Sequence, residues 1–391
     1  MDTVRLGIIG FGAQGGYYSR ILAAKMVPGM TLGAICDIDP ARRDAARGQY
    51  PDVTTFDDID ALLASDAVDA VVTTVPHYLH PEFAIKALTA GKHTLVDKPA
   101  GVYTKQVRVM NEFAATKPDL TFAIMFNQRT NPLYIELKQL LDSGELGALR
   151  HWNWIITTWW RPQGYYQQSE WRATWGGEGG GVLVNQAPHQ IDLSQWLCGM
   201  PKKVFAKLGF GFRRDIVVED EVVALFDLGG GATGSFTTSV HDVKGTDRLE
   251  ILLDGGKIVI DNSEKVTIMR FREEEQVASA RTTPESTKRL FAGENILGDD
   301  FVTTETKSYE SVWGQQHATV LTNFAAHILE GTPLIAAGSD GINGVRLANA
   351  MHLSAFLGTE VSMDFSEDQY LHELNARIAD EGKFALQPSE T

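Results

Sequence analysis

The chain has 391 residues, of which 43% are hydrophobic, and this is enough for two domains with cores of their own. Its formal net charge of −15 argues against nucleic acids and anionic membrane surfaces as partners, because both bind basic faces. The two cysteines, Cys36 and Cys198, imply no disulfide framework, and no apolar run is as long as a transmembrane helix. The N-terminus enters a strand pattern without a signal peptide, so we expect a soluble cytoplasmic protein.

The N-terminal third of the chain alternates short apolar runs with helical patterns. Apolar strands that alternate with helices are typical of a parallel sheet covered on both faces, so we predict a doubly wound α/β Rossmann domain over residues 1–125. Its expected strands are Val4–Ile9, Thr31–Cys36, Ala70–Thr74, His93–Val96 and Thr121–Met125. Its expected helices are Gln14–Lys25, Pro40–Tyr50, Ile59–Ala64, Pro81–Ala90 and Lys105–Lys117.

Longer strand patterns of alternating polarity fill the middle of the chain and predict a large, mostly antiparallel open sheet. We therefore expect an α+β domain for substrate binding and oligomerisation over residues 126–391, with last helices that could pack back on the first domain. Its expected strands are His151–Thr158, Val204–Phe212, Glu221–Phe226, Ala232–Ser239, Leu249–Leu253 and Lys257–Asp261, and its closing helices are His317–Glu330 and Asp340–Leu357.

The segment Glu273–Trp313 is polar, mixed in charge and weakly periodic. We predict a solvated loop with some strand here; a lid or an oligomer contact is the alternative.

A glycine-rich turn joins the first expected strand to the first expected helix. Gly10 allows the tight turn, Gly12 lets the backbone approach a pyrophosphate, and Gly15 permits close packing of helix on strand. Free N–H groups at the helix N-terminus would face the phosphates. The motif predicts a dinucleotide site, and its loop residues are Gly10, Phe11, Gly12, Ala13, Gln14 and Gly15.

Asp37 ends the second expected strand, 22 residues after Gly15, where a carboxylate would bind the adenosine ribose. This favours NAD, because the carboxylate would repel a 2′-phosphate. Arg42 and Arg43 follow closely and could reverse the preference, which leaves NADP open. The alternative is an ordinary glycine turn with an aspartate that caps the next helix.

A second signature follows the strand Ala70–Thr74. It reads Thr74-Val75-Pro76-His77, then His80, then Ala-Gly-Lys-His-Thr-Leu-Val-Asp-Lys-Pro over residues 90–99. These motifs resemble the T-P-N-x-x-H and A-G-K-H-V-x-x-E-K-P motifs of the glucose–fructose oxidoreductase/inositol dehydrogenase (Gfo/Idh/MocA) family. His77 stands in place of the family's Asn, and Asp97 stands in place of its Glu with a shorter reach. The resemblance covers nearly the whole chain except roughly Glu273–Trp313.

The resemblance implies an NAD(P)-dependent dehydrogenase that acts on a CH–OH group of a sugar, inositol or glycoside. It also implies that Lys98 lies near the nicotinamide and the substrate, and that the bond from Lys98 to Pro99 is cis. The cofactor contacts that it implies beyond the glycine turn and Asp37 are Thr74, Val75, Pro76, His77, His80, Asp97 and Lys98.

Residues 179–192 resemble the family's G-G-G-x-L-x-D-x-x-x-H-x-x-D. Residues three and four positions apart are neighbours on a helix, so we expect Asn185, His189 and Asp192 to share a face. We assign His189 as the general base, and Lys98 as the group that binds the same oxygen and stabilises its charge. The alternatives are a helix cap for Asn185 and a structural role in the core for His189.

Asn185 replaces the aspartate that the family usually carries. An amide cannot act as a base, but it can hydrogen-bond a hydroxyl in both directions. Because the substitution removes an anion, we expect Lys98 to lose its proton more easily than in aspartate-bearing relatives. No set of histidines has convincing metal-ligand spacing, so we expect no metal.

Most of the chain's eight tryptophans fall between residues 152 and 175. Trp152 and Trp154 alternate and would share a buried sheet face, whereas aromatic residues on the polar loop 162–177 could stack on a sugar ring. The expected substrate contacts are Lys98, Asn127, Arg129, Tyr166, Trp171, Arg172, Asn185, Gln186 and His189, with Trp160 and Arg161 as further candidates.

Three other functions suit the same fold: a redox-assisted glycosidase or lyase that retains NAD, a non-catalytic sugar or nicotinamide sensor, and an imine or biliverdin-type reductase. Lys98 together with His189 argues against the sensor, which need not keep both, and the reductase would not need the His189 helix. The large sheet has a face to cover beyond its own helices, so we expect a homodimer or homotetramer.

Overall fold

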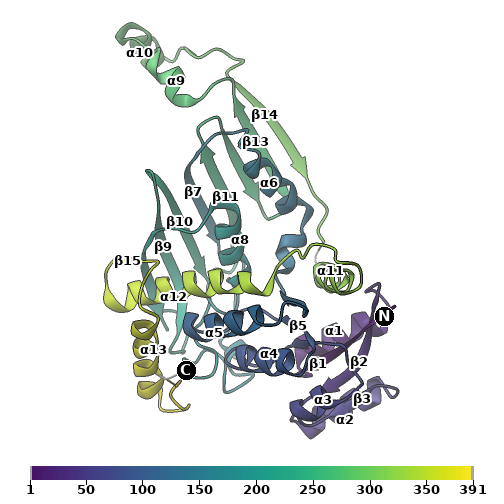
Figure 1. The fold of residues 1–391 in the computed structure, drawn as a ribbon. Helices are drawn as coiled ribbons and strands as arrows, with labels where there is room; N and C mark the ends of the chain where they lie inside the picture. The colour runs from purple at the N-terminus through teal and green to yellow at the C-terminus, as the bar shows by residue number, and fades with distance from the viewer. Residues whose placement is uncertain (1, 313, 389–391) are drawn as a thin grey trace.

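A six-stranded parallel sheet forms the N-terminal part of the computed structural model, which describes residues 2–312 and 314–388 (Figure 1). The strand order is β3-β2-β1-β4-β5-β6, so the order reverses between β1 and β4. Ligands bind at the carboxyl ends of the strands at such a switch point. The bounds are β1 Val4–Ile9, β2 Met30–Cys36, β3 Thr54–Phe56, β4 Ala70–Thr73, β5 His93–Val96 and β6 Phe122–Ile124. The predicted doubly wound sheet is confirmed, although the short β3 was not predicted.

Helices connect these strands, and the predicted helices begin and end within two residues of them. On α1, Tyr18, Ile21 and Leu22 are buried against β1, whose alternate residues are also apolar and buried. Burial on both faces explains why the strands are mostly apolar. The bounds are α1 Ala13–Ala23, α2 Pro40–Gln49, α3 Ile59–Ala64, α4 Leu79–Thr89 and α5 Thr104–Ala115.

The second sheet has nine strands in the order β14-β13-β12-β11-β7-β10-β9-β8-β15. Adjacent strands in this sheet are antiparallel, except that β7 and β10 are parallel. The predicted mostly antiparallel sheet is therefore confirmed. The strands are β7 Leu149–Ile156, β8 Lys203–Phe210, β9 Glu219–Gly229, β10 Ala232–Ser239, β11 Asp247–Leu253, β12 Gly256–Asp261, β13 Lys265–Phe271, β14 Val302–Ser308 and β15 Val361–Ser362.

Helices cover one face of this sheet, where α12 packs against β8 and α8. Beneath them Trp152 and Trp154 of β7 are buried in the core, as their alternation predicts. Within the described ranges no helix is both long and apolar enough to cross a membrane. The helices are α6 Pro132–Asp142, α7 Gln163–Tyr166, α8 Pro188–Cys198, α11 Gln316–Glu330, α12 Gly341–Leu357 and α13 Glu367–Glu381.

The segment predicted as a solvated loop contains helices α9 (Glu275–Ala280) and α10 (Pro284–Phe291) besides β14, and they project from the end of the β13–β14 hairpin (Figure 1). Its last residue, Trp313, lies outside the described residues. Our prediction was wrong in expecting no helices here. The apolar residues Leu290 and Phe291 of α10 are exposed, so the helix has no stripe that faces a core. Instead, a capping box at Thr283 and a proline at the first helical position favour α10.

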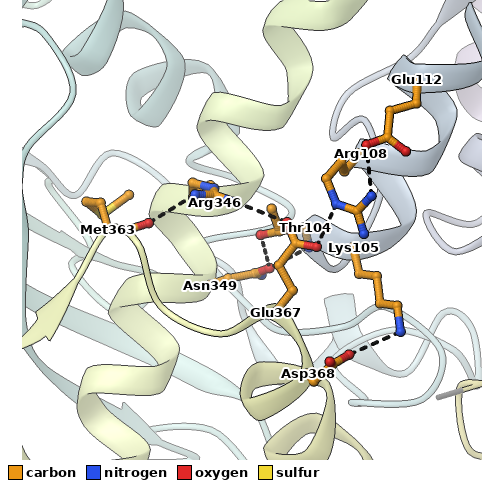
Figure 2. A network of polar contacts seen from close by, with 9 residues as sticks. All are labelled: Thr104, Lys105, Arg108, Glu112, Arg346, Asn349, Met363, Glu367 and Asp368. Carbon is orange, nitrogen blue, oxygen red and sulfur yellow. Dashed lines mark hydrogen bonds and ion pairs between the residues drawn. The ribbon is translucent and has the colours of Figure 1, made fainter. Parts of the chain in front are cut away.

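A polar network ties the last two helices to α5 of the Rossmann part (Figure 2). Asn349 of α12 is fully buried; its Oδ1 accepts from the main-chain N and the Oγ1 of Thr104, both at 2.9 Å, and its Nδ2 donates to the Val102 carbonyl. At the start of α13, Glu367 accepts from Arg108 and from Arg346. The C-terminal helices therefore act as a brace between the two sheets.

We predict that Asn349→Ala lowers the free energy of unfolding by about 2–3 kcal/mol, because it leaves the Thr104 hydroxyl and the Val102 carbonyl buried without this partner. The exposed Asn295 also makes a side-chain hydrogen bond, to Asp299, and Asn295→Ala serves as the control with an expected change below about 0.5 kcal/mol. Thermal unfolding of the three proteins measures the difference. Equal melting temperatures would contradict the role of the network.

Candidate active site

The glycine turn after β1 leaves no room for side chains at Gly10 and Gly15 but is open at Gly12. Gly10 has a φ of +97°, and a Cβ there would lie 2.5 Å from the carbonyl oxygen of Thr74. A Cβ on Gly15 would lie 2.0 Å from the Gly10 carbonyl, whereas one on Gly12 would meet only Arg42, at 3.7 Å. Gly12 also caps α1 without a side-chain acceptor. The first N–H groups of α1 therefore face the open side of Gly12, as a pyrophosphate site requires.

Asp37 stands beside this turn at the end of β2. Its Oδ2 accepts the main-chain N–H of Phe11 at 2.7 Å, and the residue is only 6% exposed. Arg43 donates to the carbonyls of Asp37 and Ile38, so its guanidinium is already used by the backbone. Arg42 lies 3.5 Å from Asp37 with a half-exposed side chain, and it is the arginine more available to a ligand.

The ends of β4 and β5 form the next wall of the site. Thr74 Oγ1 donates to the Gly10 carbonyl at 2.6 Å and so fastens the glycine turn to β4. His80 bridges the carbonyls of Val75 and Pro99, at 2.9 and 2.7 Å, which makes it a strut between the two strand ends. The bond from Lys98 to Pro99 is cis, as expected.

Asp97 is held by both of its oxygens. Its Oδ2 accepts from the hydroxyl of Tyr18 on α1 at 2.9 Å, and its Oδ1 accepts from the main-chain N–H of Lys98 at 2.7 Å. His77 lies nearby, and its ring Nδ1 is 3.1 Å from the main-chain oxygen of Glu178. Burial lowers the pKa of His77 well below its ordinary value, so this ring is neutral.

Lys98, Asn185 and His189 come together at this wall. Nζ of Lys98 donates to the main-chain oxygen of Asn185 at 3.0 Å. Burial, with a further contribution from the charge of Lys98, lowers the pKa of His189 well below its ordinary value. Nδ1 of His189 is buried and has no hydrogen-bond partner among residues 2–312 and 314–388. The site thus holds a neutral imidazole next to an ammonium group.

The expected helical face that includes Asn185 is wrong, because α8 begins only at Pro188. A proline disfavours helical backbone in the residue before it and suits the first position of a helix. Asn185 therefore lies in the preceding turn, where its N–H donates to the Gly181 carbonyl, and Ala187 takes the cap position. Glu219 of β9 holds this turn by accepting the N–H groups of Gly181 and Leu183, at 2.8 and 3.0 Å.

Arg129 was expected to contact substrate, but its guanidinium is bound by two carboxylates of the protein. Its Nε and Nη2 donate to both oxygens of Asp192 at 2.8 and 2.7 Å, and its Nη1 donates to Asp340 at 2.6 Å. It is 3% exposed. The structure therefore places Arg129 in a buried ion pair between the 3₁₀ helix η1 (Asn127–Thr130) and α8, and not among the ligand-facing groups.

The aromatic loop before α8 contributes some of the expected residues. Arg172 donates to the hydroxyl of Tyr165 at 2.8 Å, and that hydroxyl lies 3.4 Å from Asn185 Oδ1. Nε2 of Gln186 donates to the same Oδ1 at 2.9 Å. Trp171 meets the His77 ring edge-on at 5.9 Å. The structure thus brings Trp171, Arg172 and Gln186 to the site.

The other expected aromatic and arginine residues pack around Tyr165, in the core or at the surface. Tyr166 packs against two apolar clusters of the core. Trp160 is 45% exposed, and the guanidinium of Arg161 lies over the Tyr165 ring at 5.1 Å.

Two residues of the site were not predicted. His317 at the start of α11 lies 3.3 Å from Nδ2 of Asn127, and the rings of Tyr17 and Tyr18 are within 6 Å of it. Oδ1 of that asparagine is buried and has no partner within the described part of the chain. Glu178 is buried, and its Oε1 accepts from Nδ2 of Asn185. Glu178 had a detectable signal, since a carboxylate directly precedes the glycine run, whereas His317 had none in the local sequence.

The electrostatics of Lys98 differ from the sequence-based expectation. Its pKa is lowered, but burial is the largest cause. The carboxylates of Asp97 and Glu178 act against this shift. Negative charge is therefore close to Lys98 even though Asn185 replaces the family's aspartate.

Family models and curated relatives match both parts of the chain. The family model "Oxidoreductase family, NAD-binding Rossmann fold" matches residues 4–124, and "GFO/IDH/MocA C-terminal domain" matches residues 134–259. A scyllo-inositol 2-dehydrogenase (NADP(+)), IolW of Bacillus subtilis, is 24% identical and aligns over 90% of this chain and 93% of its own length. An inositol 2-dehydrogenase of Rhizobium meliloti is 26% identical over 89% of this chain and 96% of its own length.

Solved structures share the fold over most of the chain. A levoglucosan dehydrogenase in complex with NADH and L-sorbose superposes with a TM-score of 0.77 at 20% identity, over 94% of this chain and all of its own. The WlbA dehydrogenase from Bordetella pertussis, in complex with NADH and UDP-GlcNAcA, superposes with a TM-score of 0.74 at 23% identity, over 93% of this chain and all of its own. With both of its parts matched by the family models, the chain belongs to the Gfo/Idh/MocA family of NAD-binding oxidoreductases.

Proposed function

We propose that this protein oxidises a secondary hydroxyl of a sugar, inositol or glycoside to a ketone, or catalyses the reverse reaction, with NAD as the cofactor. The observation that carries the proposal is that Lys98, after β5, donates to the turn before α8 and that its charge acts on His189 of α8, while the glycine turn after β1 is open at Gly12. The inositol 2-dehydrogenases among the relatives support the class of substrate.

The residues present fit a nicotinamide dinucleotide. The N-terminus of α1 and Gly12 would hold the pyrophosphate, and Asp37 would hold the adenosine ribose. Residues 74–77 and Lys98 would border the nicotinamide. When bound, the nicotinamide accepts the hydride from the carbinol carbon.

His189 takes the hydroxyl proton in this scheme. Its lowered pKa keeps the imidazole neutral even within the ordinary histidine range, so it is free to accept a proton. Lys98 binds the same oxygen, and its positive charge stabilises the negative charge that develops there. The lowered pKa of Lys98 also lets it pass a proton on more readily than a solvated lysine would. The reverse reaction uses the same groups in the opposite order.

We further propose that the protein is a homodimer or homotetramer that pairs through the outer face of the nine-stranded sheet. Phe205 of β8 lies opposite Leu225 of β9 on that face, and both are exposed, at 45% and 55%. Val223, on the same face, is 44% exposed. Such a row of apolar side chains is typical of a surface that a partner covers.

We predict that a panel of inositols, aldoses and glycosides contains a substrate whose oxidation reduces NAD, and that NADP is used less well. The absorbance of the reduced cofactor, followed separately with NAD and NADP, is the measurement. Product formation without net NADH would instead indicate a redox-assisted glycosidase or lyase. Tight NAD binding with no reaction across the panel would contradict the dehydrogenase and favour a sensor.

We predict that Gly15→Ala weakens NADH binding roughly tenfold or more, because the added Cβ would collide with the Gly10 carbonyl and distort the turn. Gly16→Ala is the matched control, since a Cβ there meets nothing within 4 Å and alanine favours the helix. Fluorescence titration with NADH compares the two variants. Equal affinities would show that this turn does not hold the cofactor.

We predict that His189→Ala lowers kcat by roughly 10²- to 10⁴-fold, the usual contribution of a general base, while NADH affinity is unchanged. His372→Ala, an exposed histidine on α13, should behave as the wild type. Steady-state kinetics on the substrate found in the panel tests this. A variant that retains full kcat would remove His189 from the mechanism.

A further inference from the structure

One buried carboxyl group at the site has no part in the proton and hydride transfer described above. Glu178 is 2% exposed and comes directly before the glycine run that leads to α8. Its Oε2 accepts the main-chain N–H of Ala173 at 2.6 Å, and its Oε1 accepts Nδ2 of Asn185. Because each oxygen faces a donor, the geometry fits an ionised carboxylate; a carboxylic acid would need an acceptor for its own proton.

The hydrogen bond to Glu178 decides which way the Asn185 amide points. With Nδ2 on the carboxylate, Oδ1 is turned toward Nε2 of Gln186 and the hydroxyl of Tyr165, at 2.9 and 3.4 Å. The main-chain oxygen of Asn185 meanwhile receives Nζ of Lys98. One carboxylate therefore orients the residue that touches the proposed catalytic lysine.

We propose that Glu178 is a positioning residue of the dehydrogenase site: as a carboxylate it fixes the Asn185 amide, and when it takes up a proton the site loses activity. This inference rests on the proposed function, because it assigns a role within the same site.

The surroundings of Glu178 set the pH at which this happens. Burial is the largest cause that raises its pKa, to about 7, while the hydrogen bonds from Ala173 and Asn185 and the charge of Arg172 work against the rise. The titratable and charged groups that face it from the neighbouring elements are Arg172, with Nη1 at 3.8 Å from Oε1, Lys98 after β5, Glu219 of β9, Tyr166 of α7, and His77, whose ring contacts its main-chain oxygen.

The sign of the pH effect follows from these groups. As the pH falls through about 7, Glu178 takes up a proton, and one of its oxygens becomes a donor that faces another donor. The pKa of His189 lies well below its ordinary value, so the imidazole is still neutral when this occurs. The acid limb of the rate profile therefore belongs to Glu178, and the loss of activity from protonation of His189 comes at lower pH.

The first test is the pH–rate profile of Glu178→Gln. We expect wild-type kcat to fall as the pH drops through about 7. In the variant, kcat should be lower by about 10- to 100-fold, the range of a charge-assisted hydrogen bond, and that limb should be absent. Glu170→Gln, an exposed carboxylate on the same loop, should keep the wild-type profile. A Glu178→Gln profile that matches the wild type would overturn the proposal.

The second test exchanges donor and acceptor between the two residues. Asn185→Asp alone places two carboxylates in contact and should lower kcat, as Glu178→Gln does. In the double variant the new amide at 178 can donate to the new carboxylate at 185 and still accept from Ala173, so we expect kcat to recover at least about tenfold over the worse single variant. A double variant no better than the worse single variant would show a merely structural role.

The third test needs no turnover and therefore separates this inference from the proposed function. Infrared difference spectra between acid and alkaline pH should show a carboxyl band that titrates near pH 7, is absent from Glu178→Gln, and moves to higher pH in Asn185→Ala, where one stabilising hydrogen bond is lost. NADH binding and melting temperature check the fold of each variant. If no substrate reacts but this band behaves as expected, the dehydrogenase assignment fails and the Glu178–Asn185 coupling stands. A band that Asn185→Ala leaves unmoved overturns the coupling itself.

Discussion

The buried ion pair between Arg129 and Asp192 is the contact on which the arrangement of the site depends. It joins the segment that follows β6 to α8, and so fixes the helix that carries His189 relative to the parallel sheet that carries Lys98. Removing two charges from water costs several kcal/mol for each ion, and only close, bidentate geometry offsets the cost. The pair therefore tolerates little displacement, and it holds two functional groups from distant parts of the sequence in register.

Much of the architecture could be predicted because local pattern and tertiary environment agree. Strands such as β1 and β4 are mostly buried on both faces and so are mostly apolar, and the alternation of Trp152 and Trp154 reports the single buried face of β7. Among the elements that escaped prediction, α6 and α13 do bury apolar residues, but the helix α10 has no buried residue. The helix α10 begins at a capping box, and β14, which falls in the segment where some strand was predicted, is exposed along its whole length.

The sequence motifs of the site could be predicted, but the hydrogen-bond and ion-pair partners of its residues could not. The glycine turn, Lys98 and His189 are local signatures. Whether Arg129 faces a ligand or a buried carboxylate depends on Asp192 and Asp340, which are far away in the sequence. The conformation of Asn185 likewise depends on Pro188, which delays the helix, and on Glu178, which takes the amide nitrogen. Hydrogen-bond competition of this kind is settled by the tertiary fold.

The loop between β7 and α8 differs from the rest of the site in how it is held. Asp97 and Asp37 accept N–H groups of the Rossmann main chain, and Lys98 donates to the main-chain oxygen of Asn185. Arg172 and Tyr165, in contrast, are joined by a hydrogen bond between their side chains, at a short helix of four residues. The stretch from α7 to Arg172 can therefore be exchanged without rebuilding the Glu178–Asn185 contact or the hydrogen bond from Lys98. In evolutionary terms, the loop is the part in which one ancestral hydride-transfer centre could be fitted to successive carbohydrates while its proton path stayed the same.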